Sequence, residues 1–157
     1  QEKIRLELEF RPNGLLIDLE APFYGDPAPE AEAGPTSELW EHEVVEVFIA
    51  NGESYTEIEL GPHGHYLVLR LEGQRNQVSK LHEIRYRVYP SPGRWLGTAL
   101  VPFELLPPAP WTYNAYAIHG QGAARHYQAR FPVPGQAPDF HKLEFFQPLE
   151  FNLGQPG

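Results

Sequence analysis

The sequence predicts an all-β protein, an antiparallel β-sandwich of about nine or ten short strands. Three observations predict this fold class. Short segments with alternating apolar and polar residues recur along the 157 residues. Turn-forming glycine, proline and asparagine residues separate these segments. No segment has the apolar spacing of an amphipathic helix, so we expect at most one short helical turn.

The first two strands form a predicted hairpin. Residues 3–10 alternate, and the Pro12-Asn13-Gly14 turn leads into a return strand at 15–19. Residues 21–37 are rich in proline, alanine, glycine and glutamate, which predicts a long surface loop. The remaining predicted strands are 43–50, 54–60, 65–71, 82–89, 95–101, 112–119 and 126–131.

The rest of the chain is predicted to be irregular. A single helical turn is expected at 102–106, broken by Pro107 and Pro108, and the segment 132–157 is proline-rich. We expect one domain over residues 1–157, because neither flank of the 21–37 loop is long enough to bury a core alone.

Composition excludes several function classes. The net charge of -9 argues against a nucleic-acid partner, which needs a basic patch. There is no apolar run of about 18 residues, so no membrane span is expected. No signal peptide is visible, which favours a cytoplasmic location. The absence of cysteine excludes disulfides, thiolate zinc sites and a cysteine nucleophile. The sequence leaves the oligomeric state open.

Glu46 is the most informative residue, because it lies in the middle of a predicted buried strand. Strand side chains alternate faces, so Glu46 shares a face with Val44 and Phe48. A carboxylate there is costly unless it is paired, hydrogen-bonded or facing a wet cleft. The next strand also carries acids on one face, Glu57 and Glu59. The pattern therefore predicts a polar binding face on the sheet.

Acids beside aromatic and cationic side chains suit a carbohydrate ligand. Sugar hydroxyls hydrogen-bond to charged groups, and the apolar face of the ring stacks on an aromatic side chain. Alternation suggests that Tyr66 and Arg70 extend the acidic face. Trp40 is the tryptophan expected to contact a ligand, whereas Trp95 and Trp111 are expected in the core. The alternative interpretation is a solvated face with cross-strand ion pairs.

Two further functions stay open. A metal-dependent enzyme would use clustered histidines, glutamates and aspartates, with His63, His65, His119 and His141 as the candidate ligands. A hydrogen-bonded structural role is the commoner one for each histidine. The third alternative is a protein-interaction or structural domain. No residue is assigned as catalytic.

Several segments resemble the strand motifs of family-nine-type carbohydrate-binding modules, in the same order along the chain. The match is closest to an uncharacterised subgroup of that superfamily found in animals and bacteria. The segments are Trp40 six positions before Glu46, the aromatic-x-Glu-x-Glu strand from Tyr55, Trp95 with residues 101–103, Trp-x-x-Asn at Trp111, and Phe-His-x-x-Glu-x-Phe from Phe140.

The resemblance implies a β-sandwich that clamps a terminal sugar between aromatic side chains, as in a lectin-like binding module. It makes Trp40 an aromatic wall and Glu46 a hydroxyl acceptor. Sugar binders have a tryptophan before Ser-Pro where this chain has Phe131 before Pro132. Either Phe131 replaces that second wall or the sugar site is lost.

The resemblance also places further polar contacts by strand. Arg70 and Asn114 are the expected donors, and Glu57 joins Glu46 as an acceptor. Relatives that hold calcium use loop acids, so the resemblance admits a structural calcium ion. Acids available in the 21–37 loop are Asp26, Glu30 and Glu32.

Overall fold

The computed structural model describes residues 3–134 and 139–149, and these residues form an all-β structure. The strands are β1 (Arg5–Arg11), β2 (Gly14–Pro22), β3 (Gly34–Pro35), β4 (Val44–Asn51), β5 (Ser54–Leu60), β6 (His65–Glu72), β7 (Gln77–Ser79), β8 (Arg85–Ser91), β9 (Arg94–Val101), β10 (Trp111–His119), β11 (His126–Ala129) and β12 (Gln147–Leu149). The 3-10 turns are η1 (Leu39–Glu41), η2 (Phe103–Leu105), η3 (Gly122–Ala124) and η4 (Leu143–Phe145).

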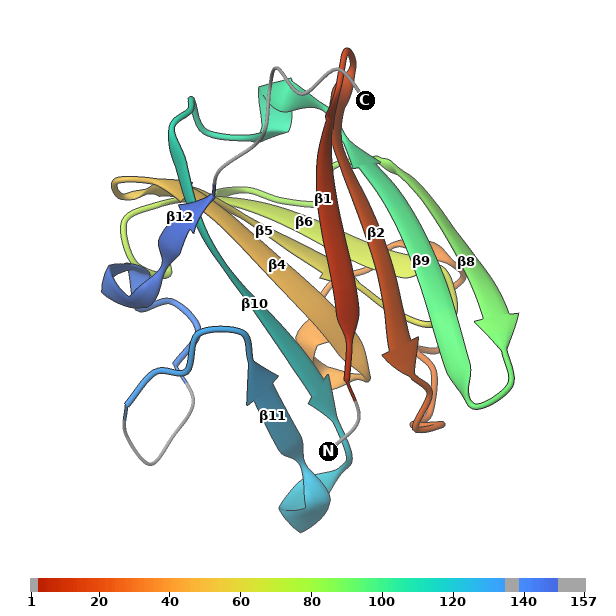
Figure 1. The fold of residues 1–157 in the computed structure, drawn as a ribbon. Helices are drawn as coiled ribbons and strands as arrows, with labels where there is room; N and C mark the ends of the chain where they lie inside the picture. The colour runs from red at the N-terminus through yellow and green to blue at the C-terminus, as the bar shows by residue number, and fades with distance from the viewer. Residues whose placement is uncertain (1–2, 135–138, 150–157) are drawn as a thin grey trace.

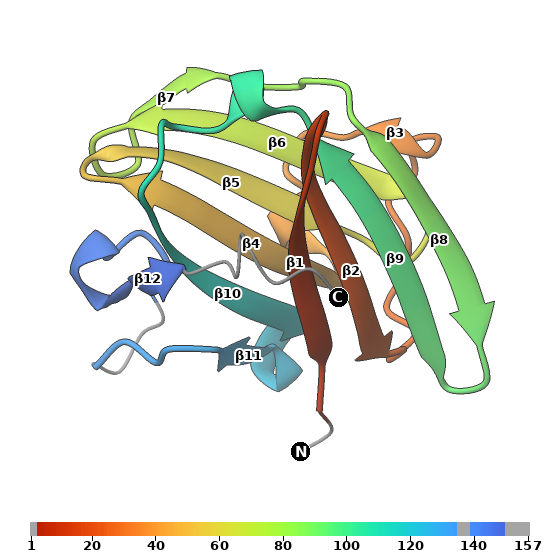
Figure 2. The same ribbon diagram turned by 45° about the horizontal axis from the view of Figure 1, so that its top comes forward.

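The strands form two sheets that pack face to face. The smaller sheet has the order β1-β2-β9-β8 and is antiparallel throughout. The larger sheet has the order β11-β10-β4-β5-β6-β3, with β12 also pairing with β10 and β7 with β6. The short β3 pairs in parallel with β6. Figures 1 and 2 show the smaller sheet running obliquely across the larger one.

The main core lies between the two sheets. Leu15, Ile17 and Leu19 of β2 point into it from the smaller sheet. Val47 and Ile49 of β4 meet them from the larger sheet, and all are fully buried or nearly so. Alternation along β4 therefore turns Val44, Glu46 and Phe48 to the opposite, outer face of the larger sheet.

The outer face of the larger sheet is also covered. Its apolar side chains, Phe48 and Tyr55 among them, form a second buried cluster with Leu39 of η1 and Phe146. Phe140 and Leu143 pack against the same cluster. We call residues 139–149 the C-terminal segment. Because it lies over β4 and β5, those strands are buried on both faces, as near-continuous burial along them shows.

The predicted strands are all present, with end shifts at several of them. The prediction for 54–60 is correct at both ends, and η2 lies within the predicted helical turn. The predicted strand 82–89 begins only at Arg85, and 126–131 ends at Ala129. The short strands β3, β7 and β12 and the turns η1, η3 and η4 were not predicted, because two or three residues carry no periodicity.

Two predicted irregular regions contain regular structure. The predicted 21–37 loop includes the end of β2 and all of β3. The predicted irregular segment 132–157 contains η4 and β12. Of that segment, residues 135–138 and 150–157 lie outside the described residues. Across the described part of the chain, no helix is long and apolar enough to cross a membrane.

Candidate ligand-binding site

A cavity of about 400 Å³ opens on the outer face of the larger sheet. The sheet supplies its floor, and residues from η1, β11 and the C-terminal segment supply its walls. Loop and strand residues after β6 border it on the remaining side. The lining residues are Trp40, Glu46, Glu57, Leu69, Leu71, Arg75, Gln77, Ile118, Tyr127, Phe140 and His141.

Two glutamates, Glu46 and Glu57, line the floor of this cavity, and the buried Glu59 lies next to them; we call these three residues the glutamate floor. The register places Glu46 of β4 directly opposite Glu59 of β5, and Glu57 lies opposite Phe48 in the next row. Glu46 is 1% exposed and Glu59 is fully buried. One carboxylate oxygen from each of the three residues lies within 4.8 Å of the others. Antiparallel pairing of two strands that carry acids at matching positions thus creates the cluster.

Burial dominates the electrostatics of the glutamate floor. It raises the pKa of Glu46 well above its usual range, and the negative charge of Glu57 raises it further. Burial likewise raises the pKa of Glu59, and the negative charge of Glu46 raises it further. Among the described residues, Glu46 Oε2 and both carboxylate oxygens of Glu59 have no hydrogen-bond donor. Three carboxylate oxygens of the glutamate floor therefore lack a hydrogen-bond partner, whereas Glu57 faces His141.

Aromatic side chains form the walls of the cavity. Trp40 is 38% exposed and projects from η1. The Arg125 guanidinium fixes the backbone of that turn by donating to the Trp40 and His42 carbonyls. Tyr127 of β11 and Phe140 of the C-terminal segment pack edge to face, with ring centroids 5.8 Å apart. The cavity thus has aromatic groups on separate elements of the chain.

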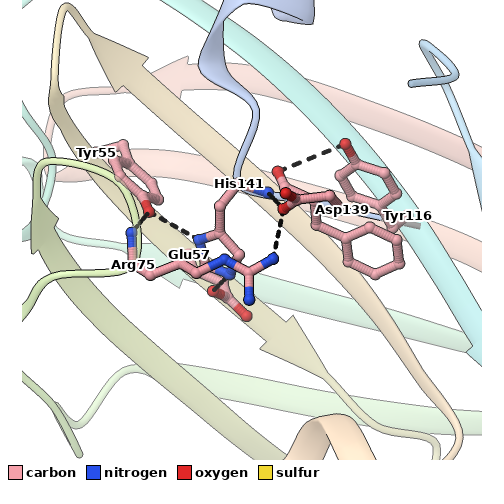
Figure 3. Close-up of polar contacts among 7 residues, drawn as sticks. Tyr55, Glu57, Arg75, Tyr116, Asp139 and His141 are labelled. Atoms are coloured by element: carbon pink, nitrogen blue, oxygen red, sulfur yellow. Dashed lines mark hydrogen bonds and ion pairs between the residues drawn. The ribbon is translucent and has the colours of Figure 1, made fainter. Parts of the chain in front are cut away.

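Polar residues at the rim form a connected network (Figure 3). The Tyr55 hydroxyl lies 2.7 Å from His141 Nδ1 and accepts a hydrogen bond from the Arg75 backbone N–H. His141 Nε2 lies 3.6 Å from Glu57 Oε1. The Arg75 guanidinium pairs with Asp139 at 2.6 Å. Burial lowers the pKa of His141, against the opposing attraction of Glu57.

The structure brings together three of the residues predicted to bind a ligand. Trp40, Glu46 and Glu57 all line the cavity. The other three predicted residues, Arg70, Asn114 and Phe131, are not among its lining residues. Trp95 and Trp111 are buried in the core between the sheets, as expected from their sequence contexts.

Arg70 lies on the opposite face of the sheet from the acids. The register pairs Arg70 with Thr56, whereas Glu57 faces Leu69. Tyr66 likewise belongs to the core between the sheets. The expectation that Tyr66 and Arg70 continue the acidic face was wrong, because alternation within one strand does not define the register with its neighbour.

Asn114 is buried and its side chain is fully engaged with neighbouring groups. Its Nδ2 donates to the Phe131 carbonyl and the Tyr116 hydroxyl, and its Oδ1 accepts from the N–H groups of Phe131 and Ala115. The Phe131 ring packs against Tyr113, with centroids 5.3 Å apart. These two residues hold the chain after β11 against β10. Asn114 and Phe131 therefore have structural contacts in this fold, and neither lines the cavity.

The four candidate histidines are not gathered into one site. His65 Nε2 lies 2.7 Å from the Ala31 carbonyl, and His63 packs edge-on against Phe23. His119 stacks on Tyr24. Within residues 3–134 and 139–149, the one group of three or more acids or histidines close enough to share a metal ion is the glutamate triad. The loop acids Asp26, Glu30 and Glu32 form no such group.

Several lining residues were missed by sequence reasoning. Tyr127 and Phe140 line the cavity together with Trp40, where Phe131 was the expected second aromatic group. Arg75 and Gln77 come from a segment that was interpreted as a polar loop. Phe140 and His141 belong to the Phe-His-x-x-Glu-x-Phe segment noted in the sequence, but no local pattern places that segment over β4 and β5.

The fold is an antiparallel β-sandwich that is shared with a solved structure. No protein-family model matches the chain. A Bacteroides uniformis crystal structure, described as a "putative carbohydrate-binding protein", superimposes with a TM-score of 0.77 at 14% identity. The match covers 93% of this chain and 77% of that one. At this identity the likeness defines the fold.

Sequence comparison gives the family. The chain is 44% identical to the rat UPF0462 protein C4orf33 homolog over 96% of its own length and 81% of the relative's. It is 42% identical to the human UPF0462 protein C4orf33 over the same shares. The zebrafish homolog is 41% identical over 90% of this chain and 78% of its own length. The chain therefore belongs to the UPF0462 (C4orf33) family, which confirms the subgroup resemblance.

Proposed function

We propose that this protein binds a small carbohydrate in the cavity above the glutamate floor. The observation that carries the proposal is the combination of acceptors and aromatic rings in one hollow. Glu46 and Glu57 supply carboxylate oxygens at the floor, and Trp40 supplies a partly exposed ring at the wall. Carboxyl groups hydrogen-bond to sugar hydroxyls in either protonation state, and sugar C–H faces stack on aromatic rings.

The size of the cavity suits a small ligand. Its volume of about 400 Å³ falls in the range of roughly 300–1,000 Å³ typical of small-molecule sites. Leu69, Leu71 and Ile118 line the same hollow and contact the apolar parts of a ligand. A flat protein-interaction face would lack such a concave, partly polar site.

Donors at the rim complement the acceptors at the floor. The Arg75 side chain is 60% exposed although it pairs with Asp139, and Gln77 also lines the cavity. Both groups donate hydrogen bonds to ring or hydroxyl oxygens. The structural likeness to a protein described as carbohydrate-binding supports the same ligand class.

Calorimetric titration with a panel of neutral mono- and disaccharides tests the proposal. At least one sugar is expected to bind, and Trp40→Ala should weaken that binding at least tenfold. Tyr89→Ala is the matched control, because Tyr89 is an exposed aromatic on β8 in the other sheet. The proposal fails if no sugar gives heat, or if Trp40→Ala binds as tightly as the unmodified chain.

A further inference from the structure

The glutamate floor has too little positive charge around it. Glu46 Oε2 and both Glu59 oxygens are buried without a donor in the described part of the chain. Buried carboxylates are normally paired, hydrogen-bonded or bound to a metal ion. Glu46, Glu57 and Glu59 come from two adjacent strands, so their positions are fixed by a paired sheet and not by a loop.

Arg75 and Arg125 make their hydrogen bonds to other groups, although the charge of Arg125 lowers the pKa of Glu46 against the larger effect of burial. Arg125 donates to the backbone carbonyls of Trp40, His42 and Gly120. Arg75 pairs with Asp139. Neither guanidinium makes a salt bridge to the three glutamates among the described residues. The imidazole of His141 faces Glu57, but its Nε2 lies 3.6 Å from the carboxylate oxygen.

We propose that Glu46, Glu57 and Glu59 together bind one oxygen-preferring divalent cation, of the calcium or manganese type. Their three oxygens lie within 4.8 Å of one another. Two oxygens on opposite sides of a calcium ion are about 4.6–5.2 Å apart, whereas around magnesium they are about 4.0–4.2 Å apart. Mutual distances within 4.8 Å are compatible with three oxygens around one such ion. Magnesium is disfavoured because it demands near-ideal octahedral geometry and gives up water reluctantly.

The cavity supplies the rest of the coordination shell. Glu46 and Glu57 border the cavity, so a bound cation would face it, with open positions for water or ligand oxygens. Tyr55 holds His141 Nδ1, which turns Nε2 toward Glu57. Such an outer hydrogen-bonding partner commonly orients a metal-binding carboxylate. The cation site shares Glu46 and Glu57 with the proposed sugar site, but its test requires no sugar, so the two proposals can fail independently.

Metal titration tests the proposal. The chain is purified without a histidine tag and stripped of metal with a chelator beforehand. We expect one Ca²⁺ or one Mn²⁺ ion to bind per chain. Calorimetry measures the binding of both ions, and the loss of the electron paramagnetic resonance signal of free Mn²⁺ measures manganese binding independently. Magnesium should bind at least tenfold more weakly. Glu59→Gln and Glu57→Gln should each weaken calcium and manganese binding at least tenfold.

Glu53→Gln is the matched control, since Glu53 lies in the exposed turn of the same β4–β5 hairpin. It should bind the ions as the unmodified chain does. Thermal unfolding of each stripped variant establishes that it is folded, and Glu57→Gln serves if the fully buried Glu59→Gln does not fold. The proposal is overturned if neither ion binds, or if binding persists unchanged in a folded glutamine variant.

Discussion

The Tyr55 hydroxyl lies 2.7 Å from Nδ1 of His141, a residue 86 positions further along the chain. The same hydroxyl accepts the backbone N–H of Arg75 at 2.9 Å. One phenol therefore joins β5 to the loop after β6 and to the C-terminal segment (Figure 3). All three elements border the cavity, so this contact sets the shape of its rim.

Replacing Tyr55 by phenylalanine should destabilise the fold by about 1–3 kcal/mol, because two polar groups lose their partner. Urea denaturation measures the change. Tyr89→Phe is the control, because Tyr89 is 50% exposed on β8. Equal stability of Tyr55→Phe and Tyr89→Phe would show that the phenol does not hold these segments.

Replacing Asn114 distinguishes a role in stability from a role in ligand binding. Asn114→Ala should cost about 2–4 kcal/mol, since its loss leaves several buried backbone groups unpaired. Sugar affinity, measured in the folded population at low temperature, should change less than threefold. The exposed Asn76→Ala serves as the control for stability. A stable Asn114→Ala that has lost sugar binding would restore the original assignment of Asn114 as a ligand donor.

Arg125 is a positioning residue for the Trp40 wall. Arg125→Ala removes the donors to the Trp40 and His42 carbonyls, so the turn η1 should become mobile and sugar affinity should fall about three- to tenfold. Titration calorimetry measures this fall. Arg85→Ala, at an exposed position on β8, should leave affinity unchanged. If both variants bind alike, Arg125 has no role in positioning Trp40.

The glutamate floor predicts how the stability of the metal-stripped protein depends on pH. The groups around Glu46 are Glu57, Glu59 and Arg125, and burial raises the pKa of Glu46 and of Glu59 in the folded state. A carboxyl with a raised pKa favours folding fully below its unfolded pKa, and that contribution is lost as pH rises through the folded value.

The two buried acids should therefore lower the unfolding temperature of the stripped chain at pH 8 relative to pH 5, against the opposite contribution of His141, whose pKa burial lowers. Glu59→Gln removes one titrating acid and should reduce this difference, with a gain in stability on the order of 1 kcal/mol at pH 8. Circular dichroism at both pH values measures it. Identical pH dependence in Glu59→Gln and in the exposed control Glu53→Gln would contradict the burial of unpaired acids.

Much of the sandwich was predictable because alternation is a local property. The pattern in β5 defines both ends of the strand and puts Ile58 and Glu57 on opposite faces. The same pattern says nothing about which residue of β6 lies beside Glu57, so Arg70 was assigned to the wrong face. Short strands such as β12 depend on pairing with β10, which no local pattern reports.

The sequence also predicted part of the candidate site, where a local pattern was enough to identify a residue. Glu46 was conspicuous because an acid between Val44 and Phe48 contradicts its strand. Tyr127 and Phe140 were not conspicuous, since an aromatic residue is equally consistent with core packing. Their role depends on how the C-terminal segment folds over the sheet, which is a property of the tertiary structure.

The indole N–H resonances of the three tryptophans test the ligand site most directly. Trp40 lines the cavity, whereas Trp95 and Trp111 lie in the core between the sheets. In a ¹H–¹⁵N spectrum titrated with the sugar that binds in calorimetry, the Trp40 indole signal should shift while the other two stay in place. A Trp40 signal that does not move while the sugar binds, or a shift confined to Trp95 and Trp111, would contradict a carbohydrate site above Glu46.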